Sequence, residues 1–352
     1  MSFKRLDPED FILSADSITA PLWSTSNPTL TTFFTSSTQE ASTAGDYYLS
    51  VYQTGSALSD SEVQFDITYA NKFGSGSALY NSAASPSNSP TKTVYGQYRA
   101  LVLGDENSDF IFGNFTGSDF WVISVARNRY KESLFPGSLT LRLTSGSGAS
   151  ILSMVLTDDS QYTSTNVFTD AGRIYNLISG SAGVRTAAVG TTAVNSNGWS
   201  INSGSYGWFL PDIGTILLNC SALAGLAGAG GISLAPSRSS NIDGFNNQRL
   251  FRAISGSTTA PTFSLNSQET VTSDYVFVRT RNSEFNYSEN PTFISGSTGE
   301  VLYADFVNNP QVYFTTVGMY NDNNELLAVA KLSRPLVKDF TKEALIRVKL
   351  DF

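Results

Sequence analysis

The sequence predicts a mainly β fold, made of antiparallel β-sandwiches with a few short helices and long Ser/Gly-rich loops. The chain has 16 Tyr and 23 Phe but only 3 Met, so many of its apolar side chains are stiff ones that suit strands. Ser, Gly and Asn, which favour turns and loops, are abundant. Charged residues make up 15% of the chain, against ~25% in ordinary soluble domains.

The composition excludes several kinds of chemistry. The 352 residues include no His and a single Cys, Cys220. Ser-His-Asp and Cys-His catalysis therefore lack their base, and zinc, copper or iron sites with His ligands cannot form. One Cys cannot make a disulfide within the chain. We expect no cofactor and no bound metal.

Charge and hydropathy bear on possible partners. The net charge is -8, so the whole chain has no positive field to attract nucleic acid, and we expect none as a partner. No run of 18 apolar residues occurs, which predicts no transmembrane helix and no membrane partner. The first residues lack the apolar segment of a signal peptide.

Pattern and composition predict four regions: an N-terminal arm (1–45), a β-rich body with one helix (46–145), a Gly/Ser-rich β insert with short helices (146–260), and a C-terminal β region completing the body (261–352). The arm carries two short apolar anchors, one at Phe11 and Ile12 and one at Trp23. Two interpretations of the arm remain open. It lies on its own domain, or it docks on a neighbouring subunit.

Period-two alternation marks the clearest strands. Residues 63–69 place apolar side chains at every second position, as in a strand with one packed face. Residues 120–126 and 138–144 also read as strands. At the C-terminus, residues 344–352 alternate apolar and charged side chains up to Phe352, which predicts a paired terminal strand.

Helix and turn signals fill the gaps. Ser89 as the cap and Pro90 in the first turn predict a helix that ends before Gly104. A second helix is expected to end at Ile254, capped by Asn241 or Asp243. Two apolar runs, 317–320 and 326–330, flank an Asn/Asp cluster and predict a hairpin.

Candidate chemistry is sparse. The acidic pairs Asp105-Glu106 and Asp158-Asp159 are the candidates for a glycosidase that works with two carboxylates, but each stands beside turn residues, where acids are ordinarily solvated. The cluster 322–325 offers oxygen ligands without the EF-hand spacing, so a hairpin turn is the better interpretation. Cys220 has no cationic neighbour in sequence, which favours a buried, inert thiol.

A basic segment and a set of aromatic residues are two further candidates for binding sites. Arg127, Arg129 and Lys131 alternate as on a strand edge, a pattern that more often marks a solvated face than a nucleic-acid site. Aromatic side chains in a cleft can stack on sugars, and three aromatic residues are the candidates for such a platform. They are Trp199, Tyr206 and Trp208.

Three C-terminal segments, 286–293, 315–322 and 326–335, resemble structural proteins of tailed-phage virions, in particular a family from T4-like contractile-tailed phages (myoviruses) of cyanobacteria. The resemblance extends to the strand at 63–70, to Tyr95–Tyr98 and to Arg127–Lys131. It implies a structural role and brings no catalytic residues.

The function that the resemblance implies is that of a non-enzymatic virion component, most simply of the contractile tail or baseplate, assembled in the host cytoplasm. Its expected partners are other virion proteins and copies of itself. A head, neck or decoration protein and a carbohydrate-binding tail adhesin are the alternatives. The residues expected at subunit interfaces are Phe3, Phe11, Ile12, Trp23, Arg347 and Phe352.

Overall fold

The structure is a computed structural model, and it shows two compact units. Unit 1 comprises Met1–Ser17 with Thr270–Phe352, and unit 2 comprises Ile18–Glu269. The described residues are 3–35, 48–55, 57–77, 80, 89–113, 115–146, 151–162, 167–186, 206–225, 231–239, 245–257, 259, 261–287 and 290–351. The boundary between the units falls within two long strands, β1 (Phe11–Pro21) and β18 (Asn266–Thr280).

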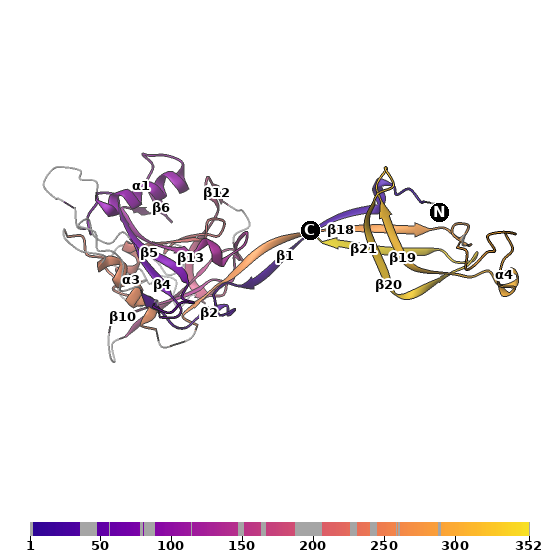
Figure 1. The fold of residues 1–352 in the computed structure, drawn as a ribbon. Coiled ribbons are helices and arrows are strands. Elements are labelled where there is room, and N and C mark those ends of the chain that lie inside the picture. The colour runs from indigo at the N-terminus through magenta and orange to yellow at the C-terminus, as the bar shows by residue number, and fades with distance from the viewer. Residues whose placement is uncertain are drawn as a thin grey trace. The chain divides into compact units, whose positions relative to one another are not determined.

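Unit 2 is built on one long antiparallel sheet (Figure 1). Its strand order is β2-β17-β10-β11-β13-β15-β16-β8-β5-β4-β3. The strands of unit 2 are β2 (Thr29–Leu30), β3 (Phe34–Thr35), β4 (Leu49–Tyr52), β5 (Val63–Asn71), β6 (Phe110–Phe112), β7 (Phe115–Gly117), β8 (Asp119–Val125), β9 (Ser133–Leu134), β10 (Thr140–Ser145), β11 (Leu152–Asp158), β12 (Val167–Thr169), β13 (Gly172–Ser181), β14 (Val184–Arg185), β15 (Gly207–Leu210), β16 (Thr215–Asn219) and β17 (Phe263–Ser264). The helices are α1 (Pro90–Leu103), α2 (Cys220–Leu223) and α3 (Phe245–Ser255), with a 3₁₀ turn, η2 (Arg127–Arg129).

The sheet of unit 2 curls so that strands from opposite ends of its order meet inside. Phe65 of β5 and Phe263 of β17 have ring centroids 5.2 Å apart, and Trp23 packs on Phe263 at 4.9 Å. Helix α3 packs against both β10 and β5, while α1 lies on β5. The predicted mainly antiparallel β fold is confirmed. What the sequence suggested as separate layers is one continuous sheet whose halves face each other.

Unit 1 holds few strands and a small interior. Its sheet has the order β1-β18-β21, and β19 pairs with β20 in a separate two-stranded sheet. The elements of unit 1, besides its parts of β1 and β18, are the 3₁₀ turn η1 (Pro8–Asp10), α4 (Asp305–Asn308), β19 (Val312–Tyr320), β20 (Leu326–Lys338) and β21 (Ala344–Asp351). Among its described residues the buried apolar side chains are Val276, Ala344 and Val348.

Several local predictions are confirmed. Helix α1 begins at Pro90, and Gly104 ends it in the left-handed region, with φ 65°. The predicted hairpin is β19–β20, and the predicted terminal strand is β21, which pairs antiparallel with β18 from Ala344 to Asp351. Helix α3 ends at Ser255, one residue past the predicted end, whereas its two candidate caps, Asn241 and Asp243, lie outside the described residues.

Two predictions about organisation are corrected. Residues 270–352 do not complete the body. They form a unit with residues 1–17, because β18 carries the chain from one unit to the other. The segment from Arg127 to Lys131 is not a strand edge, since η2 turns the chain there and Arg127 donates to the carbonyls of Tyr130 and Lys131.

Candidate functional site

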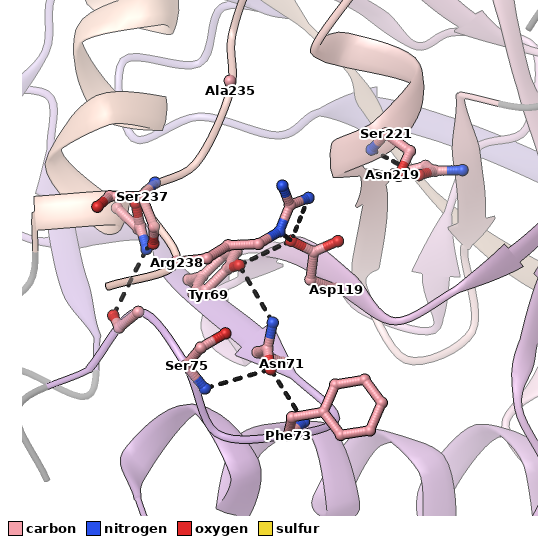
Figure 2. A network of polar contacts seen from close by, with 12 residues as sticks. Tyr69, Asn71, Phe73, Ser75, Asp119, Asn219, Ser221, Ala235, Ser237 and Arg238 are labelled. Atoms are coloured by element: carbon pink, nitrogen blue, oxygen red, sulfur yellow. Dashed lines mark hydrogen bonds and ion pairs between the residues drawn. The ribbon is translucent and has the colours of Figure 1, made fainter. Parts of the chain in front are cut away.

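A buried polar network lies where β5 ends and β8 begins (Figure 2). Asp119, at the start of β8, is 1% exposed. Its Oδ2 accepts hydrogen bonds from the hydroxyl of Tyr69 and from Nε of Arg238, each at 2.8 Å. These partners are 50 and 119 residues away in sequence. The network therefore ties a strand end to a distant loop segment.

Asn71 connects this network to the loop that follows β5. It lies opposite Asp119 in the strand register, and its Oδ1 accepts from the backbone N–H groups of Phe73 (2.9 Å) and Ser75 (3.2 Å). Gly74 takes φ 84°, a conformation that favours glycine. Ser89 Oγ donates to the Gly74 carbonyl at 2.8 Å instead of capping its own helix, which corrects the predicted cap.

The segment carrying Arg238 is held from the other side by α3. The side-chain amide of Asn246 accepts from the N–H of Ser237 and donates to its carbonyl, both at 2.9 Å. Trp121 Nε1 donates to the Asn246 carbonyl at 3.0 Å. Strand β8, helix α3 and the segment around Arg238 are thus joined by directional bonds in a buried setting, where such bonds define one arrangement.

The electrostatics of the network favour fixed protonation states. Burial, followed by the nearby Cys220 and Asp119, raises the pKa of Tyr69 far above its ordinary value, so its hydroxyl stays a donor. Burial raises the pKa of Cys220 well above the usual range, and its side chain is 0% exposed. The predicted burial of this thiol is confirmed. As a neutral thiol it is a poor nucleophile.

One oxygen of the network has no partner within the described part of the chain. Asp119 Oδ1 is buried and accepts no hydrogen bond there, while Oδ2 takes both donors. Arg238, which balances the carboxylate, is 47% exposed at its side chain. The arrangement orients a buried charge and closes loops over the strand ends. Among the described residues the network places no nucleophile next to a base, so its role is to hold the strand ends and the Arg238 segment together.

The acidic pairs divide between buried and exposed sites. Asp158 is 0% and Asp159 8% exposed, so the expectation of solvated acids is wrong for this pair. Asp158 accepts from the Gly137 N–H at 2.8 Å, and Asp159 accepts from the backbone and side-chain nitrogens of Asn176. The two carboxylates hold turns. Asp105 is exposed and accepts from Ser108 and Asn107.

The Asn/Asp cluster is a hairpin turn, as predicted. Asn321 Oδ1 accepts from the N–H groups of Asn323 (3.0 Å) and Glu325 (2.8 Å), and Asn321 Nδ2 donates to the Glu325 carboxylate. Asn324 takes φ 62°, which Asn tolerates better than most residues. The described residues contain no group of three or more His, Cys, Asp or Glu side chains placed to hold a metal ion.

The residues expected at subunit interfaces fall into three groups. Trp23 is 2% exposed and packs on Phe263 in the core of unit 2, so it serves its own domain. Phe11 and Ile12 are 52% and 53% exposed on β1. Phe352 lies outside the described residues.

Phe3 and Arg347 lie at the surface of unit 1. Phe3 is 58% exposed, and its ring meets that of Tyr320 edge-on at 5.2 Å. Arg347 places its guanidinium 5.4 Å from the ring centroid of Tyr275. The arm thus lies in part on its own unit, through Phe3, and stays largely uncovered along β1.

The described candidates for sugar stacking are buried or partly buried, and two of the basic candidates are paired with carboxylates. Tyr206 is 1% exposed, which removes it as a stacking platform, and Trp208 is partly buried against Phe112. Trp199 lies outside the described residues. Arg129 pairs with Glu62, and Lys131 pairs with Glu269 at 2.7 Å, so carboxylates already neutralise these side chains.

The Asp119 network is the feature that sequence reasoning missed. Its one signal was an acid at the start of a mostly apolar strand, residues 119–125. No described helix is long and apolar enough to cross a membrane. Comparison with known proteins gave no matching family model, no similar curated protein and no similar solved structure.

Proposed function

We propose that the chain is a non-enzymatic structural subunit of a bacteriophage virion, in the contractile tail or baseplate, that acts through contacts with other virion proteins and with its own copies. The observation that carries the proposal is the surface of unit 1. Of the exposed large apolar side chains among the described residues, sixteen lie in unit 1 and thirteen in unit 2, although unit 2 is more than twice as long.

This surface favours an assembly role. Large apolar side chains left in water usually mark a surface that a partner covers. Unit 1 buries only three apolar side chains among its described residues, a small core for its length. The resemblance of segments 286–293, 315–322 and 326–335 to phage structural proteins supplies the setting. These three segments lie in unit 1, while the other segments of the resemblance, 63–70, 95–98 and 127–131, lie in unit 2.

The head, neck or decoration location is the alternative that the same surface allows. The adhesin alternative loses its support, because Tyr206 is buried and Trp208 partly buried. The carboxylate glycosidase also loses support, because Asp158 and Asp159 are both occupied in holding turns.

The test is electron microscopy of purified particles from the source of the sequence, with gold-labelled antibody raised against the chain. Label on the tail or baseplate is the expected result. Label on the capsid overturns the tail location in favour of the head alternative. Absence of the chain from the purified particles, measured by mass spectrometry, overturns the virion role itself.

A further inference from the structure

The outer face of the β19–β20 hairpin is an uncovered surface with a definite chemistry. The strand register places Gly318 opposite Val329 and Thr316 opposite Lys331, so these four residues share one face. All four are exposed, and Val329 is 58% and the adjacent Leu327 68% exposed. An isolated two-stranded hairpin is marginally stable in water. We call this surface the hairpin face.

The hairpin face is basic as well as apolar. Lys331 continues the exposed row of β20, and Arg334 is exposed three residues later, within the irregular part of the strand between Lys331 and Leu336. Neither has an ion-pair or hydrogen-bond partner within the described part of the chain. Strand β20 therefore carries two exposed apolar side chains and two unpaired positive charges, of which Lys331 lies on the hairpin face.

The N-terminal arm offers the matching chemistry. Asp7 and Glu9 are exposed carboxylates without a basic partner among the described residues. Phe11, Ile12 and Leu13 follow directly and are 52%, 53% and 71% exposed. We call residues 7–13 the arm segment. It joins negative charge to apolar side chains, as the hairpin face joins positive charge to apolar side chains.

Both surfaces belong to unit 1, so one chain carries both halves of a complementary contact. Within a copy, the start of the arm reaches the hairpin, where Phe3 meets Tyr320. The sheet order β1-β18-β21 also leaves β1 as an edge strand, and a long edge with exposed apolar residues is prone to pair with another chain.

The exposed apolar area also reaches the size that an interface needs. Sixteen large apolar side chains of unit 1 are more than a third exposed. At 150–250 Å² for a fully exposed aromatic side chain, they present on the order of 1,500 Å². A stable interface takes about 800 Å² from each partner. Summed over its whole surface, the exposed apolar area of unit 1 is therefore large enough for an interface on this scale.

We propose that unit 1 binds a second copy of this chain, with the arm segment of one copy lying on the hairpin face of the next. The apolar residues of the arm cover Leu327 and Val329, and its carboxylates pair with Lys331 and Arg334. Such a head-to-tail contact joins successive copies into a ring if the rotation closes, or into an open filament if it does not. The inference deepens the proposed function and rests on it for its biological setting, while the contact itself is a property of the purified chain.

The experiment measures the mass of the purified full-length chain in solution by light scattering. The expected mass is a whole multiple of 37.9 kDa. Lys331→Glu with Arg334→Glu brings like charges together and weakens association at least about 10-fold. Asp7→Lys with Glu9→Lys does the same. The four substitutions in one chain reverse both sides and restore the oligomer, a rescue that a misfolded variant does not give.

A matched pair of apolar variants tests the other half of the contact. Val329→Lys in the hairpin face lowers the oligomer fraction, whereas Phe168→Lys, 68% exposed on β12 of unit 2, leaves it unchanged. A wild-type chain that stays at 37.9 kDa at micromolar concentration overturns the inference, as does an oligomer indifferent to all charge variants. Gold label on tails with a monomeric chain leaves the proposed function standing and removes only this contact.

Discussion

The two units keep their apolar side chains in different places. In unit 2 the curled sheet encloses a hydrophobic cluster that runs from Leu22 to Leu265 and includes no residue of unit 1. In unit 1 sixteen large apolar side chains among the described residues are exposed, and only Val276, Ala344 and Val348 are buried there. Because burial of apolar surface is the main favourable term in folding, unit 2 has the means to fold alone, whereas unit 1 gains most from a partner.

The units also differ in how they use buried charge. Unit 2 buries Asp119 and balances it with Arg238. Unit 1 buries Lys338 at 0% exposure, and its ammonium donates to the Asn282 carbonyl and the Asn286 side chain at 2.9 and 2.8 Å. Neutral oxygens satisfy this lysine. In a unit with few apolar contacts, such a clamp carries more of the local order than it would in a large core.

The largest effect is expected from truncating the core of unit 2. Phe65 is 0% exposed and contacts Trp23 and Phe263. Phe65→Ala leaves a cavity where the two halves of the sheet meet and costs about 3–5 kcal/mol in free energy of unfolding. Urea unfolding followed by fluorescence measures it. Phe168→Ala, at an exposed site, stays within about 0.5 kcal/mol. Equal effects at both sites would contradict an enclosed core.

The next effect is expected at Asp119. Asp119→Ala removes the acceptor for the buried hydroxyl of Tyr69 and for Arg238, which costs about 2–3 kcal/mol. Hydrogen exchange detected by mass spectrometry should show faster exchange in residues 231–239 as well as lower global stability. Asp60→Ala, at an exposed loop position, is the control and should change neither. Loss of stability without faster exchange in that segment would show that the network does not hold it.

The Asp119 network also shows which features could not be predicted from the sequence. Helix α1 was predictable to its ends, because Pro90 and Gly104 act within one or two residues of the positions they mark. The hairpin turn was predictable for the same reason. Asp119 meets Tyr69 and Arg238 across long separations that no local pattern encodes.

Trp23 and Asp158 give the same lesson for burial. Each stands among polar residues in sequence and is read there as exposed or as part of an arm, yet both are covered by strands contributed from elsewhere. The division into units was hidden as well, since it runs through the continuous strands β1 and β18. Helix ends and turns could be predicted from neighbouring residues, whereas contacts between residues far apart in the sequence could not.

A smaller effect, in unit 1, is expected from Lys338. Lys338→Met keeps the length of the side chain but leaves Asn286 Oδ1 without its lysine donor and the Asn282 carbonyl with the Asn286 amide alone, which costs about 1–3 kcal/mol. The measurement is hydrogen exchange in peptides that cover 280–287 and 336–340. Lys342→Met, whose side chain is 59% exposed, is the control with little effect. Unchanged exchange in these peptides would remove Lys338 as the clamp of unit 1.

The smallest effect is a pH dependence of opposite sign at two carboxylates, Asp158 in unit 2 and Asp339 in unit 1. Burial raises the pKa of Asp158 in unit 2, although hydrogen bonds from Ser160 and Gly137 oppose it. The folded state then binds this proton more tightly than the unfolded chain, so its contribution to stability falls as pH rises from 3.8 through the raised pKa. Asp158→Asn has no carboxyl proton to release, so the variant should not lose this stability as the pH rises through that range.

Asp339 in unit 1 has the opposite sign. Hydrogen bonds from the Thr341 hydroxyl and backbone N–H lower the pKa of Asp339 to about 2. Its contribution is present above the ordinary value of 3.8 and is lost as pH falls toward 2. Asp339→Asn should thus reduce the fall in stability between the ordinary pKa of 3.8 and pH 2. Asp158→Asn should reduce the fall in stability as the pH rises above 3.8. Both are measured as the free energy of unfolding from pH 2 to 7. Two variants that shift the curve in the same direction would contradict the contrast between a carboxyl whose pKa is raised by burial and one whose pKa is lowered by hydrogen bonds.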